Sequence, residues 1–238
     1  MISSLAIIAF AALIHASFQL SVSVLTLLSG HAIGSKTAHT KLLRLTCSFL
    51  CGVAVMTTLL LSFAAFTLQH LFGAIAPPMA WAIVCGLLLG LGIAVWAFYY
   101  RRETGTSLWL PRGMARYLSD RTKATKASAE AFNLGLGSVL AEILFVLAPI
   151  VVSALVLVQL PAAWQFAGIG LYLAISLLSL IIIWALIGSG HKLSQIQKWR
   201  EDNKRFLQFA AGSGLIVLGF YVYVEHVAAV SALAHGGL

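Results

Sequence analysis

One carboxylate and one imidazole lie inside long apolar stretches of this sequence, where ionisable side chains are rare. Glu142 is the acidic residue deep in such a stretch. Because an ionised carboxylate in hydrocarbon is unfavourable, we expect it to face a bundle interior or a cavity, or to be protonated. His15 lies in the first stretch, with Gln19 one helical turn later on the same face. Histidine titrates near neutral pH and a desolvated glutamate can bind a proton there, so the pair could form a proton relay; the alternative is a buried structural pair joining two helices.

Two further residues accompany Glu142. Pro149 follows it by two helical turns and frees a backbone carbonyl, so we expect a bend there. Breaks at mid-membrane depth often present carbonyls to a substrate or ion. Asn133 begins the same stretch, beside Gly135 and Ser138, whose small size favours close helix packing, with flexibility for substrate passage as the alternative. The predicted substrate or proton pathway comprises Glu142, His15, Gln19, Pro149 and Asn133.

The remaining reactive residues indicate neither an enzyme nor a metal protein. Cys47 and Cys51 lie four residues apart in one apolar stretch, where no further metal ligand stands out, so we interpret them as small buried hydrophobic residues. Glu225 and His226 are a weaker candidate for a divalent cation, because no motif spacing supports them. The sequence has no phosphate loop, nucleophile elbow or paired carboxylates. We therefore predict no catalytic residues, no cofactor and no metal.

The composition determines what must position these residues. Of the 238 residues, 61% are apolar and 9% are charged, and the mean hydropathy is +0.97. Soluble domains carry about 25% charged residues, so lipid is the natural solvent for most of this chain. Six apolar stretches approach the roughly 20 residues that cross a bilayer. They cover residues 4–28, 43–68, 79–100, 131–158, 162–187 and 206–227. We predict an all-α integral membrane protein with six transmembrane helices.

The basic residues predict the orientation. All 15 Lys and Arg residues fall in the first, third and fifth connections and the adjoining ends of the spans. They are Lys36, Lys41 and Arg44, then Arg101, Arg102, Arg112, Arg116, Arg121, Lys123 and Lys126, then Lys192, Lys198, Arg200, Lys204 and Arg205. Cytoplasmic loops carry such an excess, so these three loops should be cytoplasmic and both termini outside, in an inner (plasma) membrane. The net charge of +8 therefore reflects topology and predicts no nucleic-acid partner.

The order of the spans predicts two related halves. Residues 1–100 and 131–238 each hold three spans, and the halves must cross the membrane in opposite senses, which is the arrangement of an inverted repeat. Laying residues 12–21 on 139–148 matches Leu, Phe and Leu and places His15 opposite Glu142. Between the halves lies the basic connection 101–130. Its segment 110–118 mixes arginines with apolar residues and is typical of an amphipathic helix on the inner leaflet; a gate or a docking site is the alternative.

A family resemblance follows from these features. Six spans, the long basic third connection, the segment Asn203–Leu207 and the closing stretch Arg205–Gly219 resemble the lysine exporter (LysE) superfamily, which includes CcdA and the membrane domain of DsbD. The resemblance implies that the first and fourth helices carry the working residues, here around His15 and Glu142. The CcdA branch has one redox cysteine in each of those helices and the nickel and cobalt branch has a His-rich first helix. Both features are missing here.

Together these observations predict a small secondary transporter or exporter, coupled to protons, for a small solute or ion. The alternative is a membrane scaffold or assembly factor that docks a cytoplasmic partner through its basic loops. The expected partners are the lipid bilayer and the solute. The glycine-rich third and sixth spans are compatible with a homodimer as well as with packing inside one chain.

Overall fold

The structure, a computed structural model of the chain, describes residues 1–19, 36–99, 127–191 and 193–228. These residues are almost entirely helical and form no strand. The helices are α1 (Ile2–Gln19), α3 (Lys36–Phe72), α4 (Pro78–Ala94), α6 (Ser128–Ala141), α7 (Ile143–Gln159), α8 (Ala162–Ser176), α9 (Leu178–Gly188) and α10 (Leu193–Val222), with π-helices η1 (Val95–Tyr99) and η2 (Tyr223–Ala228). The end of the first predicted span and the amphipathic segment 110–118 lie outside the described residues.

The helices overlap the predicted spans but differ from them in extent and shape; α10, for example, begins at Leu193, before the predicted start at residue 206. Four helices in the described part of the chain are long and apolar enough to cross a membrane: α1, α3, α4 with η1, and the second part of α10 with η2. The pair α6 and α7 is bent by 81° and the pair α8 and α9 by 49°. The described residues therefore contain four candidate spans, or up to six if each bent pair counts as one. The fourth predicted stretch, 131–158, is a broken pair of helices rather than one continuous helix.

The break in the fourth stretch lies at Glu142 rather than at Pro149. The backbone of Glu142 has φ −88° and ψ −2°, outside the ordinary helical range. Its N–H donates to the carbonyls of both Ser138 and Val139, a shared bond that is common where a helix ends. Pro149 lies inside α7, which continues through it. A proline in the interior of a helix is tolerated here because the surrounding helices hold both sides of α7 in place.

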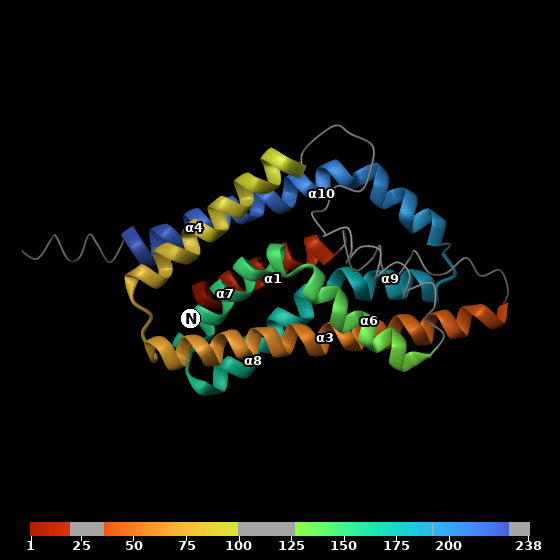
Figure 1. Cartoon of the computed structure of the whole chain (residues 1–238), viewed down its shortest axis with the longest axis horizontal. Helices are drawn as coiled ribbons and strands as arrows, with labels where there is room; N and C mark the ends of the chain where they lie inside the picture. The colour runs from red at the N-terminus through yellow and green to blue at the C-terminus, as the bar shows by residue number, and fades with distance from the viewer. Residues whose placement is uncertain (20–35, 100–126, 192, 229–238) are drawn as a thin grey trace, which may run out of the picture.

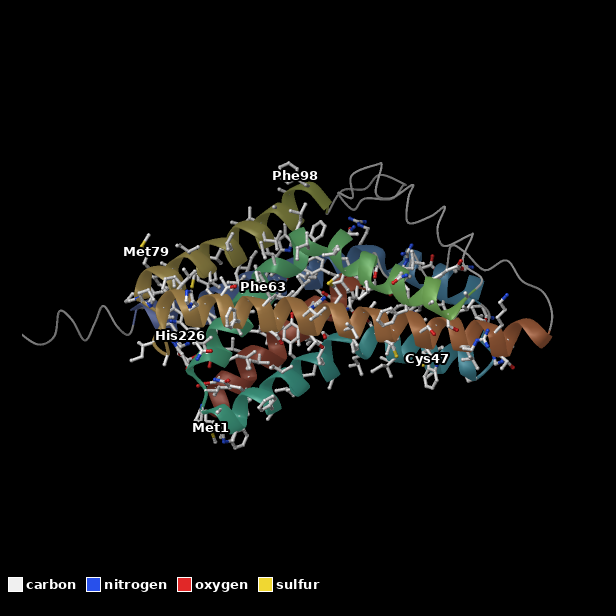
Figure 2. The ribbon with its side chains drawn as sticks, turned by 60° about the horizontal axis from the view of Figure 1, so that its bottom comes forward. Met1, Cys47, Phe63, Met79, Phe98 and His226 are labelled. Atoms are coloured by element: carbon white, nitrogen blue, oxygen red, sulfur yellow. The ribbon has the colours of Figure 1, made fainter. Side chains whose placement is uncertain are left out.

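The two central elements are α1 and α7 (Figure 1). They pack on each other between the pair α4 and α10 on one side and α3 with α8 on the other (Figure 1). In α7 most side chains are buried, whereas the outer helices expose large apolar residues such as Phe63, Met79 and Phe98 (Figure 2). An apolar exterior of this kind suits lipid rather than water.

Short connections at one end of the bundle hold the helices in this order. Gly73 ends α3 with a positive φ of 70°, a conformation that glycine adopts without a steric penalty. Pro77 then caps α4, and Pro161 caps α8. Proline suits these positions because it fixes φ and lacks an N–H that would have no helical partner. Both connections, 73–77 and 160–161, are as short as the sequence predicts.

The basic segments described by the structure lie at the opposite end. The starts of α3 and α10 share that end with the end of α9 (Figure 1). They carry the exposed residues Lys41, Arg44 and Lys198. Cys47, further along α3, is exposed (Figure 2). Cys51 is exposed as well. Burial of these two cysteines, expected from the sequence, is therefore wrong: they lie on the outer face of α3.

Candidate functional site

A buried polar cluster joins α1 to α8. His15 and Gln19 of α1 and Tyr172 of α8 are each 0% exposed. The His15 Nδ1 lies 2.9 Å from the Tyr172 hydroxyl oxygen, and the His15 Nε2 lies 3.3 Å from the Gln19 side-chain nitrogen. The imidazole and phenol rings also touch, with centroids 5.7 Å apart. The turn of α1 between His15 and Gln19 is what brings both side chains to one face.

The hydrogen bonds assign the protons of this cluster. The amide nitrogen of Gln19 can only donate, so the His15 Nε2 accepts and a neutral ring carries its proton on Nδ1. That Nδ1–H then donates to the Tyr172 oxygen. The Gln19 Oε1 is buried and has no hydrogen-bond partner among the residues that the structure describes. A buried acceptor in this state is costly, so it is a natural contact for a polar solute or for water.

Glu142 stands at the 81° break between α6 and α7 and is 0% exposed. Both ring nitrogens of His15 are engaged by Tyr172 and Gln19, so the imidazole is not bonded to this carboxylate. The break instead leaves Glu142 between two half-helices, one ending and one beginning at it. Charged groups with this degree of burial inside membrane helices mark substrate and proton paths more often than packing.

A pair of aromatic rings relates Glu142 to His15 in space. Phe18, three residues after His15, stacks on Phe145, three residues after Glu142, with centroids 5.3 Å apart and planes at 26°. Because α1 and α7 run in opposite directions (Figure 1), His15 and Glu142 lie on opposite sides of this ring pair. At a rise of about 1.5 Å per residue, the two polar groups are separated by roughly 9 Å along the helices.

The other two predicted site residues lie apart from this centre. Pro149 is buried in α7, two turns beyond Glu142. One turn later the buried hydroxyl of Ser153 has no hydrogen-bond partner within residues 1–19, 36–99, 127–191 and 193–228. Asn133 is exposed on α6. The structure therefore brings His15 and Gln19 together and places Glu142 on the neighbouring central helix, with Asn133 outside the group.

Sequence reasoning did not find Tyr172, Phe18 or Phe145 as members of the site. A tyrosine in the middle of an apolar stretch was the available signal for Tyr172, since a buried phenol needs a hydrogen-bond partner. The two phenylalanines coincide in the alignment of the halves, which was a signal that they are equivalent but not that they touch.

No metal centre is built by the part of the chain that the structure describes, where no three His, Cys, Asp or Glu side chains converge. The ring of His226 instead lies flat on Trp81, with centroids 3.8 Å apart and planes at 5° (His226 is labelled in Figure 2). This stack joins η2 to the start of α4, so a packing contact accounts for the position of His226.

Tyr172→Phe is expected to destabilise the protein by about 1–3 kcal/mol, because it leaves the His15 Nδ1 buried without its partner. The measurement is thermal unfolding in detergent, with Tyr223→Phe, at an exposed tyrosine, as the matched control. Equal melting temperatures for the two variants would contradict the assigned hydrogen bond.

No family model matches this sequence, and no curated protein or solved structure matches it either.

Proposed function

We propose that the protein is a small secondary transporter, an exporter coupled to protons, for a small solute or ion. The observation that carries this proposal is the fully buried Glu142 at an 81° break in a central helix. Transporters of several folds place their substrate and ion sites at such discontinuous helices. The buried oxygen of Gln19 on the adjacent central helix, which has no hydrogen-bond partner in the described part of the chain, supports a polar path rather than a solid apolar core.

A 3+3 inverted repeat within six spans is part of the proposal, and three contacts support it. A shift of 127 positions lays His15 on Glu142 and Phe18 on Phe145, and the two phenylalanines stack. The same shift lays Leu89 on Ile216 and Gly92 on Gly219. A Cβ added at Gly92 would lie 2.7 Å from Ile216, and one added at Gly219 would lie 2.9 Å from Leu89. Such reciprocal contacts are what a twofold axis between the halves would produce.

Two π-helices follow the same relation. The shift carries η1 onto residues 222–226, which overlap η2. The second and fifth spans depart from it, because α3 is continuous where α8 and α9 are bent by 49°. The central position of the first and fourth helices also fits the resemblance to the LysE superfamily, to which we propose this chain belongs.

In the proposed cycle, Glu142 takes up a proton from the outside and releases it to the cytoplasm in exchange for outgoing solute. The halves rock about the central pair α1 and α7, exposing the path to one side at a time. His15, held by Tyr172 and Gln19, serves as a neutral polar group beside the path. The basic ends of α3 and α10 face the cytoplasm and the termini face outside.

A second candidate function is a membrane scaffold that binds a cytoplasmic partner. The observation that favours it is the start of α10, which precedes the candidate span Arg205–Ala228. There the exposed Trp199 lies beside the exposed Lys198. A tryptophan next to a lysine is equally suited to the lipid headgroup region, so this observation weighs less than the buried carboxylate.

The test is proton flux in proteoliposomes that contain a pH-sensitive dye. Amino acids and divalent cations are added one at a time to protein-containing and protein-free vesicles. Transport predicts that at least one solute moves protons only when the protein is present, and that solute defines the substrate class. If no solute does so for demonstrably folded protein, coupled transport is wrong, and the scaffold reading is tested by binding to the basic end.

A further inference from the structure

We infer that the stacked rings of Phe18 and Phe145 form the barrier between the two polar parts of the transport path. The inference rests on the proposed function and adds to it the residues that keep the protein closed to ions. On one side of the rings lies the bonded pair of His15 and Tyr172, and on the other lies Glu142. Gln19, one residue after Phe18, lies at the level of the rings.

The rings of Phe18 and Phe145 occupy the contact between the two central helices, and each is 4% exposed. A proton or ion that passes between His15 and Glu142 must cover roughly 9 Å of helix length at this contact. The shortest course along α1 and α7 leads past the stacked rings.

The two rings belong to one apolar core cluster with neighbours such as Ile14, Val146 and Ala148, so their immediate surroundings are apolar as well. An apolar constriction excludes water and with it protons and ions, and channels use this effect as a gate. Stacked phenyl rings can also slide past each other without breaking a hydrogen bond. The contact between α1 and α8 differs, because movement there would break the hydrogen bond between His15 and Tyr172.

Phe18 and Phe145 are equivalent under the shift of 127 positions, so their contact lies where the axis of the proposed repeat would pass. A contact on that axis is shared by both half-bundles. The ring pair therefore closes the path in the conformation described here and parts only when the halves rock.

The experiment measures passive proton leak in proteoliposomes without any solute, driven by a potassium gradient and valinomycin. Phe18→Ala and Phe145→Ala are each expected to raise the leak roughly tenfold over wild type by removing the apolar constriction. Phe49→Ala is the matched control, because Phe49 is 1% exposed but belongs to the separate core cluster near α6. Its leak should equal that of wild type.

An unchanged leak in both variants overturns the barrier, and so does an equal increase in Phe49→Ala, which would indicate general loosening. If the alanine variants do not elute as folded protein, Phe18→Leu and Phe145→Leu replace them. These should give a smaller but measurable increase, and wild-type leak would again overturn the barrier. The leak assay needs no solute, so it is independent of the solute screen. If no solute moves protons but the leak is raised in the Phe18 and Phe145 variants, coupled transport is wrong and the barrier stands.

Discussion

Alanine at Gly135 or Gly52 is expected to prevent stable folding, although each substitution adds only one methyl group. The two glycines face each other across the crossing of α3 and α6. A Cβ at Gly52 would overlap the carbonyl of Phe132, and one at Gly135 would overlap the carbonyl of Phe49. Overpacking usually costs about 1–3 kcal/mol when side chains can move aside. Here the obstacle is helix backbone, so the helices themselves must separate.

The measurement is the yield of monodisperse protein on size exclusion, followed by thermal unfolding. Gly86→Ala and Gly90→Ala are the matched controls in α4, because a Cβ at either position meets nothing within 4 Å. Since alanine is the better helix former, the controls should match wild type or exceed it slightly. Normal yield and stability for Gly135→Ala would show that α3 and α6 do not approach this closely.

The same crossing has a consequence for the break in the fourth stretch. It holds α6 on α3, whereas α7 packs on α1 as well as on α3. We attribute the bend at Glu142 to this change of packing along the fourth stretch, for which Pro149 gives no signal.

Hydrophobicity alone was sufficient to locate the apolar part of helices such as α3 and α4. The predicted stretches 43–68 and 79–100 fall on α3 and on α4 with η1, because length and polarity set where a lipid-embedded helix can run. The π-helical ends and the bend at Leu177 have no comparable local signal. They depend on how neighbouring helices pack, which a single sequence does not record.

The sequence predicts those site residues that are polar and lie inside apolar stretches, because burying a polar group is energetically unfavourable. His15, Gln19 and Glu142 stand out because polar groups in apolar stretches need a reason, and all three are fully buried. Asn133 was selected by the same argument, but its side chain is exposed because it lies near the N-terminal end of α6. Tyr172 escaped notice because nothing in the sequence indicates which helix faces α1.

Glu142→Gln is expected to abolish solute-driven proton flux while leaving the protein folded. The amide keeps the size of the side chain but cannot bind and release a proton near neutral pH. If Glu142 is the only group that carries the coupled proton, no residual flux should remain above that of protein-free vesicles. Since a buried charge is costly, the variant should be at least as stable as wild type in thermal unfolding.

Glu130→Gln is the matched control for this substitution, since Glu130 lies on the same bent pair but is exposed at the start of α6. Its carboxylate accepts a hydrogen bond from the Ala127 N–H at 3.1 Å, and a glutamine oxygen can accept it as well. Flux should therefore persist in this variant. Undiminished flux in Glu142→Gln would assign the proton to another group, whereas loss of flux in both variants would indicate damage to the bent pair rather than loss of a proton carrier.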